Sequence, residues 1–386
     1  MRKFLLALIV GVIPFAQASA EELRLGFISI LSGQLALLGQ EQKRGFDLAL
    51  EALGGKVGGI DTKVFVADNK GNPGDAVQEA TKLIDRDKID VVTGLAASHT
   101  TMAALKPLLA ANVIALGANA GPSPLAGKGC NKNWFSTGFH NDQWDMAAGQ
   151  YMTQKGLKRV YFMGMDYQAG WDHVKAAIRE FKGEKVAEVY TPIAQMDFSA
   201  ELTQLRAAKP DAVFVFYVGP NAVAFLKQYT QAGLAKTIPL YSMGAIADPL
   251  LYKAEGDAAL GLVTTEAWNT ELDNAANKKF VADFNKKFGR DPTGYAARQY
   301  DAVMLLDAAI RQIKGKVSDK DALRSALRKA DFHSVRGDFR FNSNQYPILN
   351  VYVQEVSKRP DGTMYQKLTG TVIKDIKDPD YVNCKM

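Results

Sequence analysis

Apolar strand-like segments alternate with helix-like segments twice along this chain, and this alternation most restricts its fold. In the first run, strands are expected at 23–30, 63–67, 91–93 and 113–116, and helices up to about 53 and at 75–86 and 99–111. In the second run, helices are expected at 143–155, 171–181, 198–208 and 222–232, and strands at 159–165, 186–190, 212–217 and 240–242. Strands separated by long helices predict parallel sheets that are covered on both faces. We therefore expect two α/β lobes, with boundaries near Gly138 and Trp268.

The C-terminal part of the chain departs from this alternation. Helical periodicity is found at 278–288, 295–313 and 320–329, and strand-like segments follow at 339–342 and 348–356. This pattern indicates that the chain ends outside the two α/β runs.

The first twenty residues have the composition of a secretory leader. Arg2 and Lys3 precede an apolar run over 4–15, and small residues follow at Ala18 and Ala20. This arrangement is typical of a cleaved signal peptide, and the run is too short for a membrane-spanning helix. We expect residues 1–20 to be removed, a mature chain starting at Glu21, and a periplasmic location.

Composition argues against several other classes of protein. The formal charge is +6, from 47 basic and 41 acidic residues without a long block of one sign, so nucleic acid is not an expected partner. The chain has four His and two distant Cys, and neither phosphate-binding glycine loops nor hydrolase motifs follow a strand. We expect no cofactor, no metal site and no catalytic residues. The adjacent Ser98 and His99 keep a hydrolase as a remote alternative.

Ser98 is the residue with the strongest positional signal. It follows the expected strand 91–93 and begins a helix, and ligands of open α/β sheets bind at the carboxyl ends of strands, near helix N-termini. A serine there offers a hydroxyl and a backbone N–H to a carboxylate. It is also a preferred helix cap, so position alone leaves both roles open.

Short motifs follow one another in a fixed order between residues 23 and 356. They are Leu31-Ser32-Gly33, Gly39-Gln40-Glu41-Gln42-Lys43-Arg44-Gly45, Asp68 with Asn72-Pro73, Val92-Thr93-Gly94 ahead of Ser98, Asp166-Tyr167-Gln168-Ala169-Gly170, Phe225-Leu226-Lys227-Gln228-Tyr229 with Gln231-Ala232-Gly233-Leu234, and Pro292-Thr293-Gly294-Tyr295-Ala296-Ala297 ahead of Tyr300-Asp301-Ala302. In this order they resemble the leucine/isoleucine/valine-binding protein family, the periplasmic substrate-binding subunits of ABC importers.

The resemblance implies a type I periplasmic binding fold, with two Rossmann-like lobes of parallel sheets joined by a multi-strand hinge. The first lobe is expected at 21–138 plus 269–330, and the second at 139–268 plus 331–386, with the C-terminal tail returning to the first lobe. Chain crossings are expected near 138–141, 266–269 and 330–332. The expected partners are a small carboxylate ligand and the membrane permease subunits of an importer, and we expect a monomer.

The resemblance also implies a ligand site between the lobes. Ser98 occupies the position of the serine that holds the ligand carboxylate, which favours a ligand contact over a plain cap. The expected site consists of Leu38, Ala97, Ser98, Asn119, Ala120, Gly121, Tyr167, Ala169, Tyr217, Gly219, Gly244 and Tyr295. At Gly121, where amino-acid binders have a Ser or Thr, only backbone contacts are implied.

The expected partner of a ligand ammonium is missing from this chain. The acid of the family's second lobe matches a place close to Gly244, and Asp248 lies about a turn of helix further on. Tyr167, Trp171, Tyr217, Trp268 and Tyr295 follow strands or lobe crossings, and aromatic walls suit a flat ring. For Trp268, hinge packing is the favoured role.

We therefore expect a small carboxylate without an ammonium, aromatic by preference, as in the aromatic-carboxylate branch of the family. The alternatives are a branched-chain amino acid held by Asp248 or Glu266, and an exported ligand-sensing domain.

The two cysteines, Cys130 and Cys384, are expected to form a disulfide, because an exported chain folds in an oxidising compartment. The bond would fasten the C-terminus to the loop at 127–133 of the first lobe.

Overall fold

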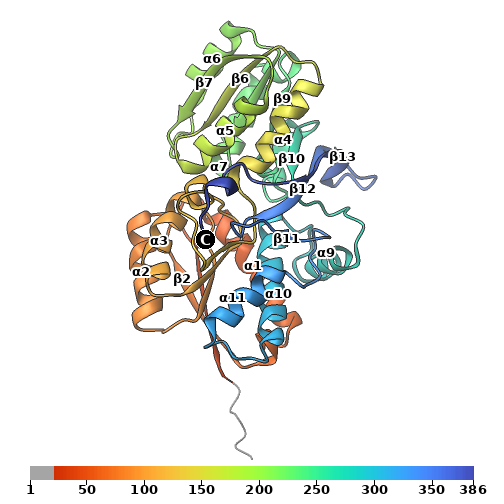
Figure 1. Ribbon diagram of the computed structural model, residues 1–386. Coiled ribbons are helices and arrows are strands. Elements are labelled where there is room, and N and C mark those ends of the chain that lie inside the picture. Colours follow the sequence, from red (N-terminus) through yellow and green to blue (C-terminus); the bar gives the residue numbers. More distant parts are fainter. Residues whose placement is uncertain (1–20) are drawn as a thin grey trace, which may run out of the picture.

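The computed structural model describes residues 21–386, and it has two lobes stacked end to end, each built around one β-sheet (Figure 1). The expected signal peptide, residues 1–20, lies outside the described residues. No helix within 21–386 combines the length and the apolar character that a membrane span requires.

The first sheet has five parallel strands in the order β2-β1-β3-β4-β5. The strands are β1 (Leu23–Ser29), β2 (Thr62–Asp68), β3 (Val91–Gly94), β4 (Ile114–Gly117) and β5 (Trp134–Ser136). Successive side chains of a strand point to opposite faces. Phe27 accordingly packs on Phe46 of α1 (Ala36–Ala52), with 4.9 Å between ring centroids, whereas Ile28 belongs to the apolar cluster on the other face.

Helices cover both faces of this sheet. The Ile28 side is covered by α2 (Pro73–Asp85) and α3 (Ser98–Ala110). The Phe27 side is covered by α1 and by three helices from much later in the chain: α9 (Ala275–Phe288), α10 (Gly294–Gln312) and α11 (Lys320–Lys329). The C-terminal helices thus complete the core of the first lobe.

The second sheet has the order β11-β12-β10-β9-β8-β6-β7, with β13 beside β12. Its parallel strands are β6 (Arg159–Met165), β7 (Glu184–Thr191), β8 (Ala212–Phe216), β9 (Leu240–Met243) and β10 (Val263–Glu266). Strands β11 (Arg340–Phe341), β12 (Pro347–Lys358) and β13 (Met364–Ile376) are added antiparallel. Helices α4 (Asn141–Gln154) and α5 (Gln168–Glu180) pack together on this sheet, which also carries α6 (Ser199–Ala208), α7 (Pro220–Gln231) and α8 (Tyr252–Glu255).

Three strands of the structure were not among those expected: β5, β10 and β13. Strand β5 has three residues, and β10 reads Val-Thr-Thr-Glu, so neither shows an apolar run. Strand β13 is the outer strand of a hairpin and is mostly half-buried or exposed. Each is held in place by its neighbour in the sheet more than by its own sequence.

The predicted disulfide between Cys130 and Cys384 is confirmed, with 5.7 Å between the Cα atoms. It fixes the C-terminal tail to the loop that follows the short 3-10 helix Ser123–Leu125 of the first lobe. Asp380 and Asn383 of the tail also lie next to Gly127 in this loop. The tail therefore runs from the second sheet back to the first lobe.

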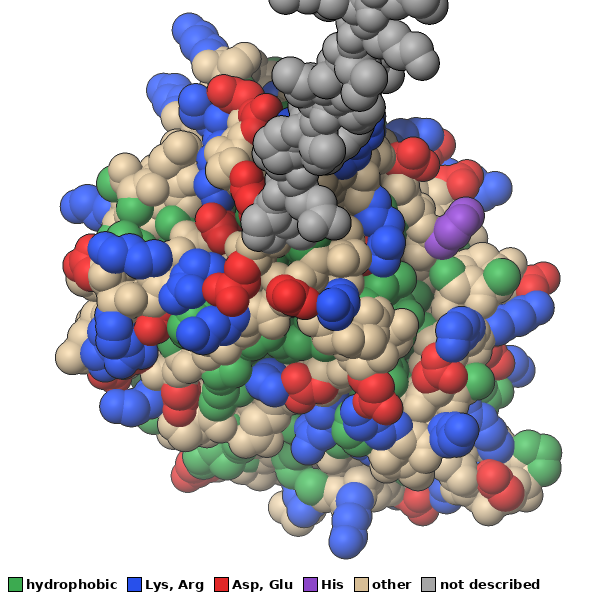
Figure 2. All heavy atoms as spheres, turned by 90° about the horizontal axis from the view of Figure 1, so that it is seen from below, with side chains coloured by type: hydrophobic (Ala, Val, Ile, Leu, Met, Phe, Trp, Pro, Cys, Tyr) green, Lys and Arg blue, Asp and Glu red, His purple; other side chains and the backbone are tan. Residues whose placement is uncertain are grey.

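Charged side chains of both signs are interspersed on the end of the first lobe that faces away from the second (Figure 2). A continuous basic surface is not seen on this face.

Candidate functional site

A narrow cavity lies between the two lobes, where the carboxyl ends of strands from both sheets meet. Its wall is formed by Leu38, Ala96, Ala97, Ser98, Asn119, Ala120, Phe139, Asn141, Tyr167, Ala169, His173, Phe216, Val218, Met243 and Tyr295. The free volume is about 30 Å³, which is room for about two water molecules. Of the twelve expected site residues, eight line this cavity: Leu38, Ala97, Ser98, Asn119, Ala120, Tyr167, Ala169 and Tyr295.

Ser98 is the first residue of α3, and the helix cap is Ala97. Alanine has no side chain that could accept a hydrogen bond, so no capping side chain at Ala97 binds the first N–H groups of α3. Oγ of Ser98 accepts a hydrogen bond from Nδ2 of Asn141 across 3.1 Å, so the hydroxyl proton remains available to a ligand. The hydroxyl is thus buried in the cavity wall and is not used as a helix cap.

His99 does not act on Ser98 in this structure. Its Nε2 lies 3.0 Å from the backbone oxygen of Gly71, and its ring meets Tyr167 edge to face. Burial lowers the pKa of His99. A nucleophile and its base must be within hydrogen-bond reach of each other, and here the partner of Ser98 is Asn141.

Gly121 was expected to offer backbone groups to the ligand, and this is wrong. Its N–H donates to Oδ1 of Asn141 across 3.2 Å, and its carbonyl accepts from the N–H of Asn141 across 2.8 Å. A Cβ at this position would lie 1.8 Å from the carbonyl oxygen of Phe139, so only glycine fits. Asn141, which the sequence did not reveal, therefore links Gly121 to Ser98.

Tyr217 was expected in the aromatic wall of the cavity, and this is also wrong: the residues on either side of Tyr217 form the wall instead. Phe216 and Val218 line the cavity, and because strand side chains alternate, Tyr217 points into the core of the second lobe. Its hydroxyl lies 3.1 Å from Oγ1 of Thr191, and its ring packs on Phe225. Gly219 likewise is not part of the cavity wall; it is the residue before α7.

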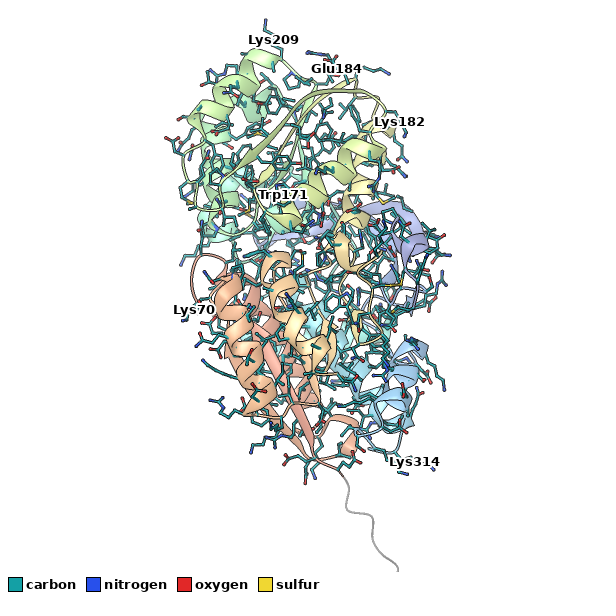
Figure 3. The ribbon with its side chains drawn as sticks, turned by 60° about the vertical axis from the view of Figure 1, so that its left-hand side comes forward. Lys70, Trp171, Lys182, Glu184, Lys209 and Lys314 are labelled. Carbon is teal, nitrogen blue, oxygen red and sulfur yellow. A yellow bond between two sulfur atoms is a disulfide. The ribbon has the colours of Figure 1, made fainter. Side chains whose placement is uncertain are left out.

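The two tryptophans of the expected aromatic set lie away from the cavity wall. Trp171 is 38% exposed on the second lobe, at the side that faces the first, and its Nε1 donates to Asp166 (Figure 3). Trp268 packs on Phe280 in the core of the first lobe, and its Nε1 donates to Asn277 across 2.7 Å. Trp268 therefore has the packing role that was favoured for it.

Gly244 lies beside the cavity and not in it. With Asp248, Glu266, Tyr295 and Arg298 it lines a smaller neighbouring space. A Cβ on Gly244 would lie 3.0 Å from a carboxylate oxygen of Glu266. The Glu266 carboxylate is in turn bound to Arg298 across 3.1 Å, while burial raises the pKa of Glu266. Both acids considered as ammonium partners, Asp248 and Glu266, are therefore placed outside the cavity wall.

His173 is a cavity residue that the sequence did not reveal. Its Nδ1 is hydrogen-bonded to the buried carboxylate of Asp145, and its ring stacks on Phe216 with 4.2 Å between centroids. The two partners lie 28 residues apart on α4 and α5, so no local motif joins them.

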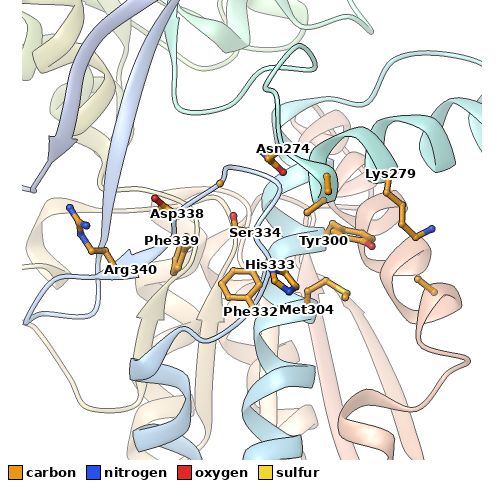
Figure 4. A pocket seen from close by; sticks show the side chains of 14 residues that line it. Asn274, Lys279, Tyr300, Met304, Phe332, His333, Ser334, Asp338, Phe339 and Arg340 are labelled. Atoms are coloured by element: carbon orange, nitrogen blue, oxygen red, sulfur yellow. The ribbon is translucent and has the colours of Figure 1, made fainter.

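A larger hollow, of about 860 Å³, lies on the flank of the first lobe (Figure 4). Tyr300, Met304, Phe332 and Phe339 line it, and Lys279 and Arg340 stand at its sides. It is built from one lobe and the segment that leads into β11, including Arg340, whereas the interlobe cavity gathers polar groups from both lobes. The interlobe cavity is therefore the candidate site.

Comparison with known proteins places these observations in a family. The family model described as "Periplasmic binding protein" matches residues 22–362. An ABC transporter solute-binding protein from R. palustris, solved in complex with benzoate, is 31% identical, with a TM-score of 0.88 over 95% of this chain and 100% of that chain. A solute-binding protein of an ABC transporter from Rhodopseudomonas palustris BisB5, in complex with 3,4-dihydroxy benzoic acid, is 29% identical, with a TM-score of 0.86 over 93% and 99%. The Leu/Ile/Val-binding protein homolog 6 of Brucella melitensis biotype 1 is 29% identical over 95% of this chain and 96% of the relative.

Proposed function

Because this chain belongs to the periplasmic binding protein family, we propose that it captures a small aromatic carboxylate between its lobes and delivers it to the permease subunits of an ABC importer. The similarity to solute-binding proteins solved with benzoate and with dihydroxybenzoic acid supports this ligand class. The relatives named for leucine, isoleucine and valine make a branched-chain amino acid the second candidate.

The observation that carries the proposal is the set of polar groups in the cavity wall. Ser98, Tyr167 and Tyr295 line the cavity, and within residues 21–386 their hydroxyl groups donate no hydrogen bond to a protein acceptor. Burial raises the pKa of Tyr167 and of Tyr295, so both hydroxyls stay protonated. A ligand carboxylate in the cavity would therefore meet hydrogen-bond donors. Hydrogen bonds to a charged group are stronger than those between two neutral groups.

The acids around the cavity are already engaged. Asp145 is bound to His173, Glu266 to Arg298, and Asp172 accepts hydrogen bonds from Asn141 and Gln168. An ammonium enclosed here would be left without a carboxylate, and a buried unpaired charge costs several kcal/mol. These contacts favour an acid without an amine over an amino acid.

The rest of the wall suits a flat ring. Phe139, Tyr167, Phe216 and Tyr295 line the cavity from both sides. Offset or edge contacts with such rings contribute about 0.5–1.5 kcal/mol each beyond the buried area. Because the present free volume is about 30 Å³, the lobes must part for such a ligand to enter and then close around it.

We further propose that the lobes, 21–138 with 269–330 and 139–268 with 331–386, rotate about the three chain crossings. The C-terminal tail, which the Cys130–Cys384 disulfide fixes to the first lobe, would stay with that lobe. Contacts such as that of Gln34 Nε2 with the backbone oxygen of Ile193, at 2.7 Å, would break on opening. X-ray scattering with and without saturating ligand should show a smaller radius of gyration in the bound form. Identical profiles would contradict the rotation.

The ligand class is best tested with two molecules that differ only in the ammonium group. Calorimetry on the chain from Glu21 onward should show binding of benzoate and 3-phenylpropanoate, and no binding of phenylalanine, leucine or valine. Tight binding of leucine or valine without a response to either aromatic acid would overturn the ligand class. Sequencing of the exported protein should give Glu21 as the first residue, and size-exclusion chromatography should give a monomer.

A further inference from the structure

Gln34 of the first lobe reaches across the boundary between the lobes. It lies in the loop between β1 and α1, and its Nε2 donates to the backbone oxygen of Ile193 across 2.7 Å and to Oδ1 of Asn221 across 3.3 Å. A glutamine amide has two hydrogens, so each acceptor can take one. Both acceptors belong to the second lobe: Ile193 follows β7, and Asn221 is in the first turn of α7.

The second lobe holds these two acceptors in place by itself. Nδ2 of Asn221 donates to the backbone oxygen of Ile193 across 2.9 Å and to that of Gln195 across 2.7 Å, and Asn221 is fully buried. Turning this amide over would break both bonds, so Oδ1 is the atom that it offers to Gln34. The second lobe therefore presents a pair of oriented acceptors that fits an incoming amide.

The residue after Gln34 is anchored in the second lobe as well. Leu35 is 4% exposed and belongs, with Leu38, to the apolar cluster that contains the core of the second lobe. Burial of apolar surface favours the closed arrangement but has no direction. The two hydrogen bonds of Gln34 are directional, so they fix which groups of the two lobes meet.

The order of the strands places this contact far from the hinge. Strand β1 lies next to β2, the outer strand of the first sheet, and β7 is the outer strand of the second. The three chain crossings follow β5 and β10 and precede β11, which lie toward the opposite sides of their sheets. In a rotation, displacement grows with distance from the axis, so the contact of Gln34 must separate when the lobes part.

We propose that Gln34 is a latch at the mouth of the cleft: its amide binds Ile193 and Asn221 only when the lobes close, and it thereby slows the release of the enclosed ligand. This inference rests on the proposed function, and it adds a residue that controls how long the ligand stays without being part of the cavity wall. Because the ligand enters and leaves the open form, loss of the latch should change dissociation and leave association nearly unaffected.

Stopped-flow measurements with benzoate and 3-phenylpropanoate, followed by tryptophan fluorescence, give the two rates separately. Gln34→Ala removes the latch and should raise the dissociation rate about three- to tenfold, as the net contribution of a hydrogen bond predicts. The association rate constant should stay within about twofold of the wild type. Both ligands should be affected by the same factor, because the latch touches neither of them.

Gln34→Glu gives a readout that loss of packing would not give. Glutamate fills the same space, but its ionised carboxylate has no hydrogen to donate and would face two oxygen acceptors. Asn221 cannot turn over to meet it without losing its bonds to Ile193 and Gln195. Dissociation from Gln34→Glu should therefore be faster than from Gln34→Ala.

Gln40→Ala and Gln40→Glu are the matched controls. Gln40 is also exposed, and its Nε2 donates to a backbone oxygen, that of Leu31, across 3.0 Å, but this bond stays within the first lobe. Both variants should release the two ligands within about twofold of the wild-type rate. An equal increase in the Gln34 and Gln40 variants would mean that disturbance of the loop is responsible, and it would overturn the latch.

X-ray scattering from the ligand-free proteins gives a readout that needs no ligand. Gln34→Glu should have a larger radius of gyration than the wild type, because it loses the closed molecules that the latch holds. At saturating benzoate the two radii should agree, since the enclosed ligand still closes the lobes.

The outcomes separate the two proposals. If the aromatic acids bind but both Gln34 variants release them at the wild-type rate, the latch is wrong and the ligand class stands. If only leucine or valine binds, the ligand class is overturned, and the release rates of that amino acid test the latch in the same way. If none of these compounds binds, the proposed function is overturned, and equal ligand-free radii would overturn the latch as well.

Discussion

Arg298 donates from Nη1 to Oε1 of Glu266 across 3.1 Å, and its other terminal nitrogen donates to Oδ1 of Asn119 across 2.9 Å. Glu266 ends β10 in the second sheet, and Asn119 follows β4 in the first. The guanidinium also lies over the rings of Phe139 and Trp144, at 5.2 Å and 4.9 Å from their centroids. One buried cation therefore joins both lobes directly behind the wall of the cavity.

We expect Arg298→Met to lower the free energy of unfolding by about 3–5 kcal/mol, because the buried carboxyl group of Glu266 would lose its cationic partner. The double variant Arg298→Met with Glu266→Gln removes both charges and should recover most of this loss. Urea unfolding of the three proteins measures the effect. Equal stabilities of the single and double variants would show that the charge pairing is not what matters.

Ser98→Ala should weaken binding of an aromatic acid about 10- to 150-fold, since a hydrogen bond to a charged group contributes about 1.5–3 kcal/mol. The hydroxyl lost is the one that Asn141 orients. Ser123→Ala is the matched control, because Ser123 bonds to Asp142 and is not in the cavity wall. If both variants bind equally well in calorimetry, Ser98 is not a ligand contact.

Replacing both cysteines, Cys130→Ser with Cys384→Ser, should lower the free energy of unfolding by up to about 5 kcal/mol, because the bond closes a loop of 254 residues. Thermal melts of the oxidised wild type and the variant give the difference. Two free thiols in the unfolded, unreduced wild type would contradict the pairing.

Stability should decrease with rising pH through the titration of Asp248. Burial raises the pKa of this carboxyl from its ordinary value of 3.8 to about 7. Below about pH 4 the carboxyl is protonated in both the folded and unfolded states, and its contribution is fully present. Between these two values the folded state keeps a proton that the unfolded state has lost, so the free energy of unfolding falls by up to about 1.4 kcal/mol per pH unit.

Asp248→Asn removes this titration, so the difference between the wild type and the variant gives the part of the pH dependence of stability that is due to Asp248. Glu255, whose pKa is raised to about 8 mainly by burial and also by Asp248, still titrates in the variant. Urea unfolding from pH 4.5 to 8 should give a steeper decline in the wild type than in Asp248→Asn. Parallel curves would mean that Asp248 is not protonated in the folded state near neutral pH.

The fold was readable from the sequence where burial imposes a pattern. Buried parallel strands such as β4 and β8 are apolar runs, and their helices show one apolar face. In a strand that is buried on both faces, however, the sequence does not show which side chains point to which face. Nearly every side chain from Ala212 to Val218 is apolar, so no alternation in the sequence indicated that Tyr217 points away from the cavity.

Only some of the polar residues of the site could be predicted from the sequence. Ser98 could be predicted from its neighbours in the sequence, because it begins a helix shortly after a strand. The pairs Asp145–His173 and Glu266–Arg298 have none, since each joins two elements that only the folded chain brings together. Gly244 and Gly121 were visible as departures from a pattern, but the atoms nearest to a Cβ at these positions come from Glu266 and Phe139, which are distant in the sequence.

The covalent link at the C-terminus makes most of the chain into a closed ring. Cys130 and Cys384 enclose all of the second sheet, as well as α9, α10 and α11 of the first lobe. A protease that cuts once anywhere inside this ring leaves a nicked molecule that is still one covalent piece. Its two fragments separate on a denaturing gel only after a reducing agent is added.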